Sequence, residues 1–550
     1  MSILLALQQF LGANTQRNAK LLPGAGIGVD ARNLDVSHGD FRGLKAADVK
    51  HTLTGLGVQQ ISLYRFNRDT QPADDGSDIW LTSSADTNYV RSLIALDTTL
   101  RTYWSDGVKP RYTDTTLIGG SPPYPAAYVD LGVPKPSSAM TATLTTPGTG
   151  PDETRVYLDT FLRANGDESA PNVNTTSITV PGGSSVTLNA FASVPGGSHG
   201  ITKRRIYCFT GTGDFLRVVE QTAATLSYVD NGSSRGATLE TGAADSRPDW
   251  ETPPDAMVGL IELWGNMFGA HLGKSFLICV PGKPHAWPVA YQGVVPHSIV
   301  GTARFGTTWV LCTTGIPYYV SGTTPLGMLS PRPVEFEQAC VSKRSVISVK
   351  HGVCWASNEG LCYVGSNGAP RILTAPFLSV EDWQALVPST IIGAHWKGWY
   401  LGFYNQGGTR KGFMVSTVDP QSIIWLDQGA FGVFEDTISG AVYLLGPYSG
   451  GSEPVRKWYT GSLLTATFKS GKQRADQESN PSVAMVVGTD YTSASLKVYA
   501  DGVLKHTKTL TSQDPYRLPG GYVGRDFQLE LAGTGPLEGA LIAEGMEDLP

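Results

Sequence analysis

At 550 residues the chain exceeds what one hydrophobic core normally supports, which predicts several domains. It holds 64 glycines and 35 prolines, while charged residues make up only 16%, against roughly 25% in average usage. This composition favours short strands and tight turns over long surface helices, and a net charge of -6 without a long basic run argues against a sequence-specific nucleic-acid reader.

The first segment, residues 1–136, begins with an apolar stretch that lacks the positive region and cleavage site of a signal peptide, so we expect a short docking helix or arm. No stretch approaches eighteen consecutive apolar residues, and a soluble protein is expected. Strand-like runs such as QQISLYRF and LRTYWS predict an N-terminal β region, able to contribute a blade to a propeller formed by residues 251–471 and to make oligomer contacts. Five prolines from Pro122 to Pro136 predict an extended connector.

The second segment, residues 137–250, has evenly spaced strand patterns separated by turn sequences, which predict a β-sandwich. Tyr157, the turn GDESAP at Gly166 to Pro171, and Ile206-Tyr207 before a turn make it resemble a fibronectin type III module inserted into the surrounding fold. Arg204 and Arg205 are expected on an exposed strand face.

The third segment, residues 251–471, contains a loose repeat. Glycines that break successive hairpins lie 41, 46, 46 and 42 residues apart, at Gly265, Gly306, Gly352, Gly398 and Gly440. A period in the low forties, with a second hairpin in each unit, predicts the four-stranded blades of a β-propeller, and a sixth blade can come from the N-terminal segment around residues 80–107. Unrelated hairpins with accidental spacing are the alternative.

The fourth segment, residues 472–550, alternates apolar and polar residues again and predicts a small C-terminal β domain. The expected fold class is therefore all-β: a propeller of four-stranded blades, an inserted fibronectin type III-like sandwich and a terminal β domain.

Several apparent motifs lack the context that their chemistry needs. Gly269 to Ser275 has too few residues between its glycines for a phosphate loop and predicts a hairpin turn, while Gly196 to Gly200 matches a nucleophile elbow but is expected in a β-β loop. Gly24 to Gly28 is spaced too tightly for a dinucleotide site.

Metal and acid-base chemistry have equally little support in the sequence. Asp69, Asp74, Asp75 and Asp78 depart from the calcium-loop register, and His285 and His395 are expected to be structural. The six cysteines contain no CxxC pair, so we expect reduced, buried thiols: Cys208, Cys279, Cys312, Cys340, Cys354 and Cys362. The sequence predicts no catalytic, cofactor-binding or metal-binding residue, and no enzyme.

Several longer strings carry a resemblance that covers nearly the whole chain. They are RTYWSDGVKPRYTD with YPAAYVDLGVPKP, KPHAWP at Lys283 to Pro288, TTGIPYYVSG at Thr313 to Gly322, CVSKRSV at Cys340 to Val346, and NEGLCYVGSNGAPRILT at Asn358 to Thr374. In these strings the chain resembles the tail nozzle proteins of short-tailed bacteriophages.

The resemblance implies a virion protein made in the host cytoplasm and assembled as a homo-oligomer, expected to be a hexamer, at the distal end of the tail. Its implied partners are a tail adaptor ring, tail fibres or spikes, and genome DNA, which passes through the lumen without sequence-specific binding. Two other functions stay open: a receptor-binding tail protein that recognises cell-surface glycans, and a propeller glycan hydrolase, which needs two facing carboxylates.

Overall fold

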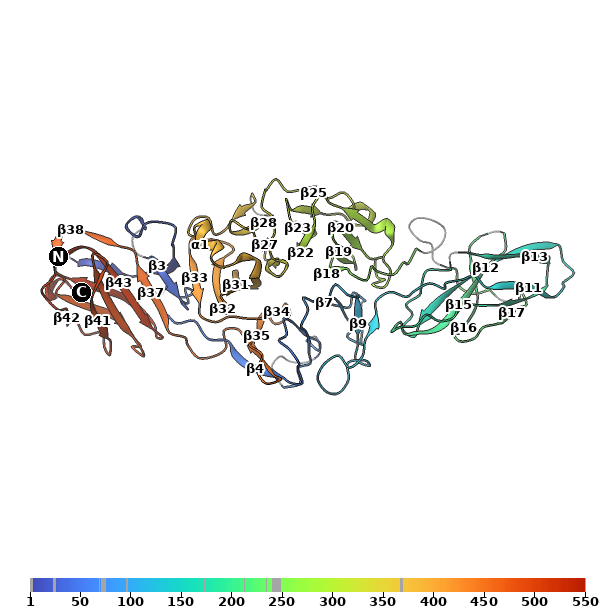
Figure 1. The fold of residues 1–550 in the computed structure, drawn as a ribbon, viewed down its shortest axis with the longest axis horizontal. Helices are drawn as coiled ribbons and strands as arrows, with labels where there is room; N and C mark the ends of the chain where they lie inside the picture. Colours follow the sequence, from blue (N-terminus) through green and yellow to red (C-terminus); the bar gives the residue numbers. More distant parts are fainter. Residues whose placement is uncertain are drawn as a thin grey trace.

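The computed structural model describes residues 3–22, 26–68, 70, 76–94, 97–172, 174–211, 213–233, 235–239, 249–366 and 369–549. These residues are mostly in strands, and the part of the chain they cover contains a single short α-helix, α1 (Val380–Gln384). The molecule is elongated: a sandwich lies at one end, a group of small sheets in the middle, and both chain termini at the other end (Figure 1). The abundance of turn residues thus produced the nearly all-β fold that the composition predicts.

Five antiparallel groups of strands follow one another along the third segment, and the fourth of them is continuous with a larger, eleven-stranded sheet. Their strands are β18 (Val258–Glu262), β19 (Phe268–Leu272), β20 (Ser275–Ile278) and β21 (Gln292–Val294); β22 (Ile299–Phe305), β23 (Thr308–Thr313), β24 (Tyr318–Val320) and β25 (Arg332–Pro333); β26 (Ile347–Val349), β27 (Gly352–Ala356), β28 (Leu361–Gly365) and β29 (Arg371–Ile372); β30 (Ile392–Trp396), β31 (Trp399–Gln406), β32 (Thr409–Ser416) and β33 (Ile423–Leu426); and β34 (Gly432–Asp436), β35 (Ala441–Leu445) and β36 (Glu453–Lys457), completed by β4 (Asp48–Leu53).

The predicted equivalence of the five repeat glycines is confirmed. Each lies at the turn between the first and second strand of its sheet, and four of the five have positive φ angles: Gly265, Gly306, Gly398 and Gly440. The fifth, Gly352, begins β27, where a Cβ atom would lie 2.1 Å from the carbonyl oxygen of Val364. The glycines are therefore required by backbone conformation in four turns and by close strand approach in the fifth.

The N-terminal segment adds two further sheets to this group. One is four-stranded, with strands β7 (Asn88–Arg91), β8 (Thr102–Ser105), β9 (Arg111–Thr113) and β10 (Val129–Asp130); the other is the hairpin of β5 (Ser62–Arg65) and β6 (Trp80–Ser83). The first strands of neighbouring sheets contact one another in the series β7, β18, β22, β26, β30, β34 and β5. The stacked rings of Tyr64 on β5 and Tyr89 on β7, 5.6 Å apart, join the two ends of the series.

The second segment forms a two-sheet sandwich. One sheet contains β11 (Thr141–Thr146), β14 (Ser185–Asn189) and β17 (Tyr228–Asp230); the other contains β13 (Thr176–Pro181), β12 (Asp152–Arg163), β15 (Ile201–Phe209) and β16 (Leu216–Thr222). Tyr157, Leu188 and Ile206 are fully buried between the sheets.

The expectation that Arg204 lies on an exposed strand face is wrong. Arg204 is fully buried between the rings of Phe161 and Phe191, and its Nε lies 3.2 Å from Asp159 Oδ2. Arg205 is half-buried and pairs with Glu168 at 2.6 Å. Strand alternation places neighbouring residues on opposite faces, so the two arginines could not share one exposed face.

The terminal domain combines both ends of the chain. One sheet pairs β1 (Ile3–Leu7) with β44 (Leu537–Ala543), followed by β39 (Val483–Gly488) and β42 (Tyr516–Arg517). The other runs from β33 through β2 (Phe10–Ala13) and β3 (Gly26–Arg32) to β37 (Ala466–Ser470), β43 (Gly524–Gly533), β40 (Ser495–Ala500) and β41 (Val503–Thr509), with β38 (Gln473–Ser479) also paired to β43.

The N-terminal arm consequently forms strands and no docking helix. Its apolar residues Leu5, Leu7 and Phe10 are buried in the core shared with the C-terminal strands. The division at residue 471 cuts across a sheet, because β37 and β38 on either side of it both pair with β43, whereas the division at residue 136 falls between β10 and β11, which belong to different sheets. The first segment is not one unit, because β1 pairs with β44 and β3 with β37, more than 400 residues away. No helix in the described part of the chain is long and apolar enough to cross a bilayer.

Candidate functional site

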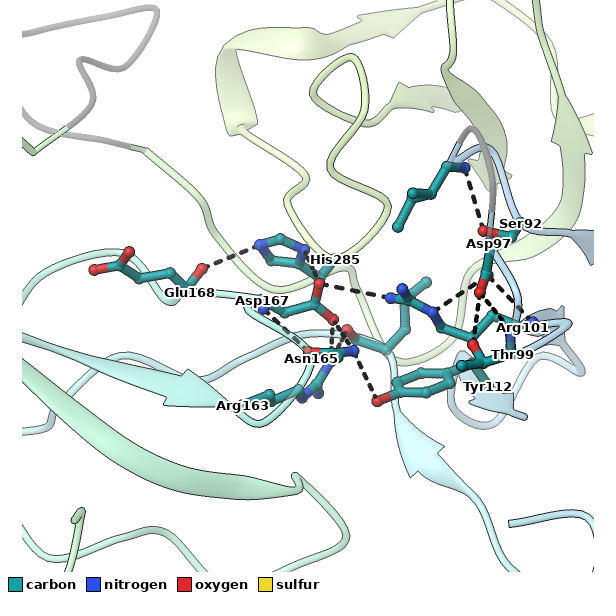
Figure 2. A network of polar contacts seen from close by, with 12 residues as sticks. Ser92, Asp97, Thr99, Arg101, Tyr112, Arg163, Asn165, Asp167, Glu168 and His285 are labelled. Atoms are coloured by element: carbon teal, nitrogen blue, oxygen red, sulfur yellow. Dashed lines mark hydrogen bonds and ion pairs between the residues drawn. The ribbon is translucent and has the colours of Figure 1, made fainter. Parts of the chain in front are cut away.

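A buried polar network joins the sandwich to the neighbouring sheets (Figure 2). Four segments contribute: the loop after β7, strand β9, the end of β12 with the turn that follows it, and the loop after β20. We call this set the junction network; its members are Ser92, Asp97, Thr99, Arg101, Tyr112, Arg163, Asn165, Asp167, Glu168 and His285.

Arg163, at the end of β12, ties the sandwich to the connector that enters it. Its side chain is only 2% exposed and donates to the carbonyl oxygens of Leu131 at 3.1 Å, Gly132 at 2.8 Å and His199 at 2.7 Å. The guanidinium also lies 5.5 Å from the ring of Tyr112 on β9. One buried cation therefore satisfies backbone carbonyls of the connector and of the loop at residues 190–200.

Asp167 is the central anion of the junction network. Its carboxylate lies 3.3 Å from Arg163 Nη1, 3.4 Å from His285 Nδ1 and 3.9 Å from Arg101 Nη1. Burial opposes ionisation, but contact with the His285 ring and the two guanidiniums outweighs it and holds the pKa of Asp167 well below its usual range. Asp167 is therefore a fixed negative charge that three segments share.

Asp97 holds the loop after β7 in place. Burial disfavours its charge, yet hydrogen bonds from Thr99 and Ser92 and the charge of Arg101, 3.4 Å away, lower its pKa. A cavity of about 580 Å³ opens beside Asp97 and Arg101. Because Asp97 and Asp167 both stay ionised at neutral pH, neither can supply the proton that a glycosidase acid must give.

Two carboxyls with raised pKa lie elsewhere in the fold. Burial raises the pKa of Asp159 and of Glu453 to about 7 in each case. Both side chains are fully buried, Asp159 in the sandwich and Glu453 on β36, so no substrate reaches them.

A small apolar cluster packs next to the junction network. Ala170, Trp250 and Ala286 form one buried cluster, and Lys283 Nζ lies 4.4 Å from the ring of Trp250. His285 Nε2 lies 3.1 Å from the carbonyl oxygen of Glu168. The sequence singles out the turn GDESAP and the string KPHAWP separately, and the structure brings the two into contact; nothing in their sequences pairs them.

A second polar cluster lies where the small sheets converge. The 3-10 helix η4 (Lys343–Ser345), which we call the central segment, contacts β22, β27 and β30. Arg344 donates to the carbonyl oxygens of Ile61 at 2.6 Å and Phe431 at 2.7 Å, just before β5 and β34. Lys343 Nζ lies 3.3 Å from an Asp86 carboxylate oxygen, just before β7.

The central segment therefore reaches six of the sheets in the series. Burial lowers the pKa of Arg344 to about 10, although Asp86 opposes the shift. Burial and the charge of Lys343 also lower the pKa of the buried His271, on β19 of the seventh sheet, to about 3. A three-residue segment can touch so many sheets only where their inner strands approach one another.

The apparent motifs of the sequence lie mostly in turns, loops and strands with a structural role. Gly269 to Ser275 spans the β19–β20 hairpin turn, as predicted, and Gly196 to Gly200 lies in the loop before β15. His199 in that loop has Nδ1 3.7 Å from Asp130 Oδ2. Gly26 to Gly28 begins β3, while Gly24 and Ala25 lie outside the described residues.

The aspartates at residues 69–78 and the histidines are the other possible site residues in the sequence. Asp78 is buried and accepts a hydrogen bond from Arg65 Nε at 2.5 Å; Asp69, Asp74 and Asp75 lie outside the described residues. His395 Nε2 accepts from the backbone N–H of Gly398 at 3.2 Å. All six cysteines are buried and free, as predicted. Within the described ranges, no group of three or more His, Cys, Asp or Glu side chains could hold a metal ion.

Neither a protein-family model nor a curated protein matches the chain. Similar solved structures include BBS1N in complex with ARL6DN, at 10% identity over 76% of this chain and 98% of that chain, with a TM-score of 0.31. AztD from Citrobacter koseri has 12% identity over 70% and 99%, with a TM-score of 0.25. An exo-beta-1,3-galactanase from Phanerochaete chrysosporium has 9% identity over 56% and 100%, with a TM-score of 0.23. These scores are too low to assign a fold or a function to this chain.

Proposed function

We propose that this protein is a structural component of a phage tail, an oligomeric nozzle at the distal end through which genome DNA leaves the virion. In this proposal the series of small sheets is a β-propeller whose blades surround the central segment. The unbroken contacts of the first strands, from β7 round to β5, support that architecture.

The observation that carries the proposal is where the nozzle-like strings lie in the fold. RTYWSDGVKPRYTD contributes Arg101 and Tyr112 to the junction network, and KPHAWP contributes His285. CVSKRSV contributes Lys343 and Arg344 of the central segment. Three of the strings thus contain residues that fix the sheets and the sandwich relative to one another, which supports a rigid structural role.

The central segment also decides where DNA would pass. Lys343 and Arg344 occupy the point where the sheets converge. A DNA duplex is far wider than a space that three residues can fill, so it cannot pass through this point. The conduit therefore has to run between copies of the chain about a rotational axis, with rigid wedges packed around it. The wall of this conduit would carry few Lys or Arg side chains, because each DNA phosphate that they neutralise adds affinity for the DNA and slows its passage.

Electron microscopy tests the proposal directly. Particles labelled on this chain should show the label at the distal tail end, and the purified chain at high concentration should form a ring, expected to be a hexamer, with an open centre. A chain that stays monomeric at every concentration and is missing from particles would contradict it. Co-purification of the adaptor ring and of fibres or spikes would identify the proposed partners.

Glycan recognition is the second candidate function, and a specific cavity favours it. That cavity is separate from the junction network and the central segment, and is described below. Glycan hydrolysis is the weaker alternative, because Asp97 and Asp167 remain ionised and the carboxyls with raised pKa are buried.

A further inference from the structure

A cavity of about 510 Å³ lies where the loop after β3 meets the β30–β31 hairpin. Its floor is apolar, formed by the buried side chains of Leu34, Leu44 and Met414. In Figure 1 this region lies between the terminal domain and the group of small sheets, near the labels β3 and β32. We call it the aromatic cavity, because Trp396, Trp399 and Tyr459 also line it.

The local sequence explains the position of the two tryptophans. Lys397 and Gly398 both have positive φ angles, which form the tight turn that suits a two-residue hairpin. Trp396 and Trp399 are directly paired across that turn, so their side chains lie on one face of the sheet. The ring of Tyr459 lies 4.9 Å from that of Trp396, whereas no described aromatic ring or cation is stacked on Trp399.

A carboxylate forms the polar side of the cavity. Asp35 is 5% exposed and accepts hydrogen bonds from the backbone N–H of Ser37 at 3.0 Å, from the Ser37 hydroxyl and from the Tyr459 hydroxyl. Oδ1 receives the two bonds from Ser37 and Oδ2 the single bond from Tyr459, so Oδ2 keeps an acceptor site for one further hydroxyl. The Asp35–Arg42 backbone hydrogen bond of 2.9 Å fixes this loop.

Lys397 lines the aromatic cavity and Lys45 lies near its Tyr459 ring, so both place positive charge close to it. Lys397 Nζ lies 5.2 Å from the Trp396 ring and 5.8 Å from the Tyr459 ring, and Lys45 Nζ lies 5.6 Å from the Tyr459 ring. Neither lysine has a carboxylate within ion-pair distance among the described residues. A cationic ligand would be repelled, while an anionic ligand would pair with an exposed, mobile lysine.

We propose that the aromatic cavity binds an acidic sugar residue of a polysaccharide. The apolar face of the sugar ring stacks on Trp399, a ring hydroxyl donates to Asp35 Oδ2, and the sugar carboxylate pairs with Lys397. The Asp35 carboxylate, which can only accept hydrogen bonds, favours a hydroxyl-rich sugar over a nucleic-acid strand, although aromatic rings and lysines also suit a nucleic acid. The inference is independent of tail assembly and can be tested on the purified chain.

Calorimetric titration of the full chain with three probes tests the proposal. The probes are tetragalacturonic acid, its methyl ester, and an oligothymidylate of equal charge. We expect saturable binding of the acid at about millimolar Kd or tighter, and roughly tenfold weaker binding of the ester, which keeps the stacking face but loses the charge. The oligothymidylate should bind no better than the ester.

Two variants and a matched control complete the test. Trp399→Ala should abolish binding of both sugars, and Lys397→Glu should weaken the acid about tenfold without affecting the ester. Lys350→Glu, in the equivalent turn between β26 and β27, should change neither. The exposed Lys397 tolerates substitution, so this arm remains informative if Trp399→Ala does not fold.

Three outcomes would overturn the proposal. One is no saturable binding of tetragalacturonic acid at about 10 mM. Another is undiminished binding in Lys397→Glu. The third is tighter binding of the oligothymidylate, lost in Lys397→Glu, which would assign the cavity to nucleic acid.

Discussion

At the scale of single residues, buried charges fix the geometry of this protein. Arg163 is enclosed by carbonyl oxygens and by Asp167, so its removal leaves several acceptors and one anion without their partner. Breaking a buried pair in this way costs far more than losing an exposed one. The junction network should therefore be sensitive to substitution of Arg163.

The substitution Arg163→Met tests how much the buried pair of Arg163 and Asp167 stabilises the sandwich. We expect it to lower the free energy of unfolding of the sandwich by about 3–5 kcal/mol, because the Asp167 carboxylate stays buried without its cation. Urea unfolding followed by fluorescence measures the loss. Arg217→Met is the matched control, since Arg217 is 36% exposed and 4.0 Å from Glu220; equal effects of the two substitutions would contradict the assignment.

Glu453 makes stability depend on pH in the opposite sense to a paired carboxylate. Gln60 N–H donates to its Oε1 at 2.5 Å, while Oε2 has no hydrogen-bond partner among the described residues. Since burial raises the pKa to about 7, above the unfolded value, the folded state binds the extra proton. Stability from this group is complete below about pH 4.5 and is lost as pH rises through 7.

Glu453→Gln removes that dependence. We expect the variant to gain Tm relative to the parent at pH 8 and to show a smaller gain or none at pH 5, as measured by differential scanning calorimetry. Glu335→Gln, at an exposed position, should shift Tm equally little at both pH values. A Glu453→Gln gain of the same size at both pH values would rule out the titration.

At the scale of elements, the central segment connects sheets that are distant in sequence. Arg344→Met removes two donors and leaves the carbonyl oxygens of Ile61 and Phe431 unpaired, at a cost of about 1–3 kcal/mol. Hydrogen exchange should accelerate in β5 and β34 and stay unchanged in the sandwich strands. Lys350→Met is the control; unchanged exchange in β5 would show that the central segment does not hold this end of the series.

The elements differ in how far the sequence determines them. The repeat glycines are predictable because a hairpin turn needs positive φ or close strand approach locally, and four of the five positions show the first and one the second. The partners of β1, β3 and β4 are not predictable, because each pairs with strands more than 400 residues away. Arg204 was misplaced because a buried cation needs a partner such as Asp159, which the local pattern cannot reveal.

In the candidate sites, too, some features can be predicted from the sequence and others arise only from the tertiary fold. The hairpin HWKGWY is visible in the sequence, and its turn residues Lys397 and Gly398 fix Trp396 opposite Trp399. Asp35 reaches them only because β3 pairs with β37, which carries the loop after β3 to this side of the molecule. The junction network likewise depends on four segments that only the tertiary fold brings together.

At the scale of the whole molecule, the N-terminal arm is the element on which the terminal domain depends. β1 is the edge strand of the sheet β1-β44-β39-β42, and β2 lies between β33 and β3, so the arm connects the terminal domain to the small sheets. Leu5, Leu7 and Phe10 are almost completely buried in this core. The chain ends are therefore a structural joint between two parts of the elongated molecule.

Deletion of residues 1–13 should expose the apolar edge of β44 and weaken the eleven-stranded sheet at β33, where only the pairing of Arg32 with Trp425 would still join β33 to β3. We expect trypsin to cleave the region 466–549 rapidly, while the sandwich at residues 137–239 keeps its parent resistance because its core contains no residue of the arm. A synthetic peptide of residues 1–13 should restore protection when added in excess, and a scrambled peptide should not. Uniform protease sensitivity along the chain would mean that the deletion unfolds everything and that the arm is no separate joint. Unchanged resistance of the C-terminal region would show that its own strands suffice, so β1 and β2 would be accessory to a domain that the C-terminal segment forms alone.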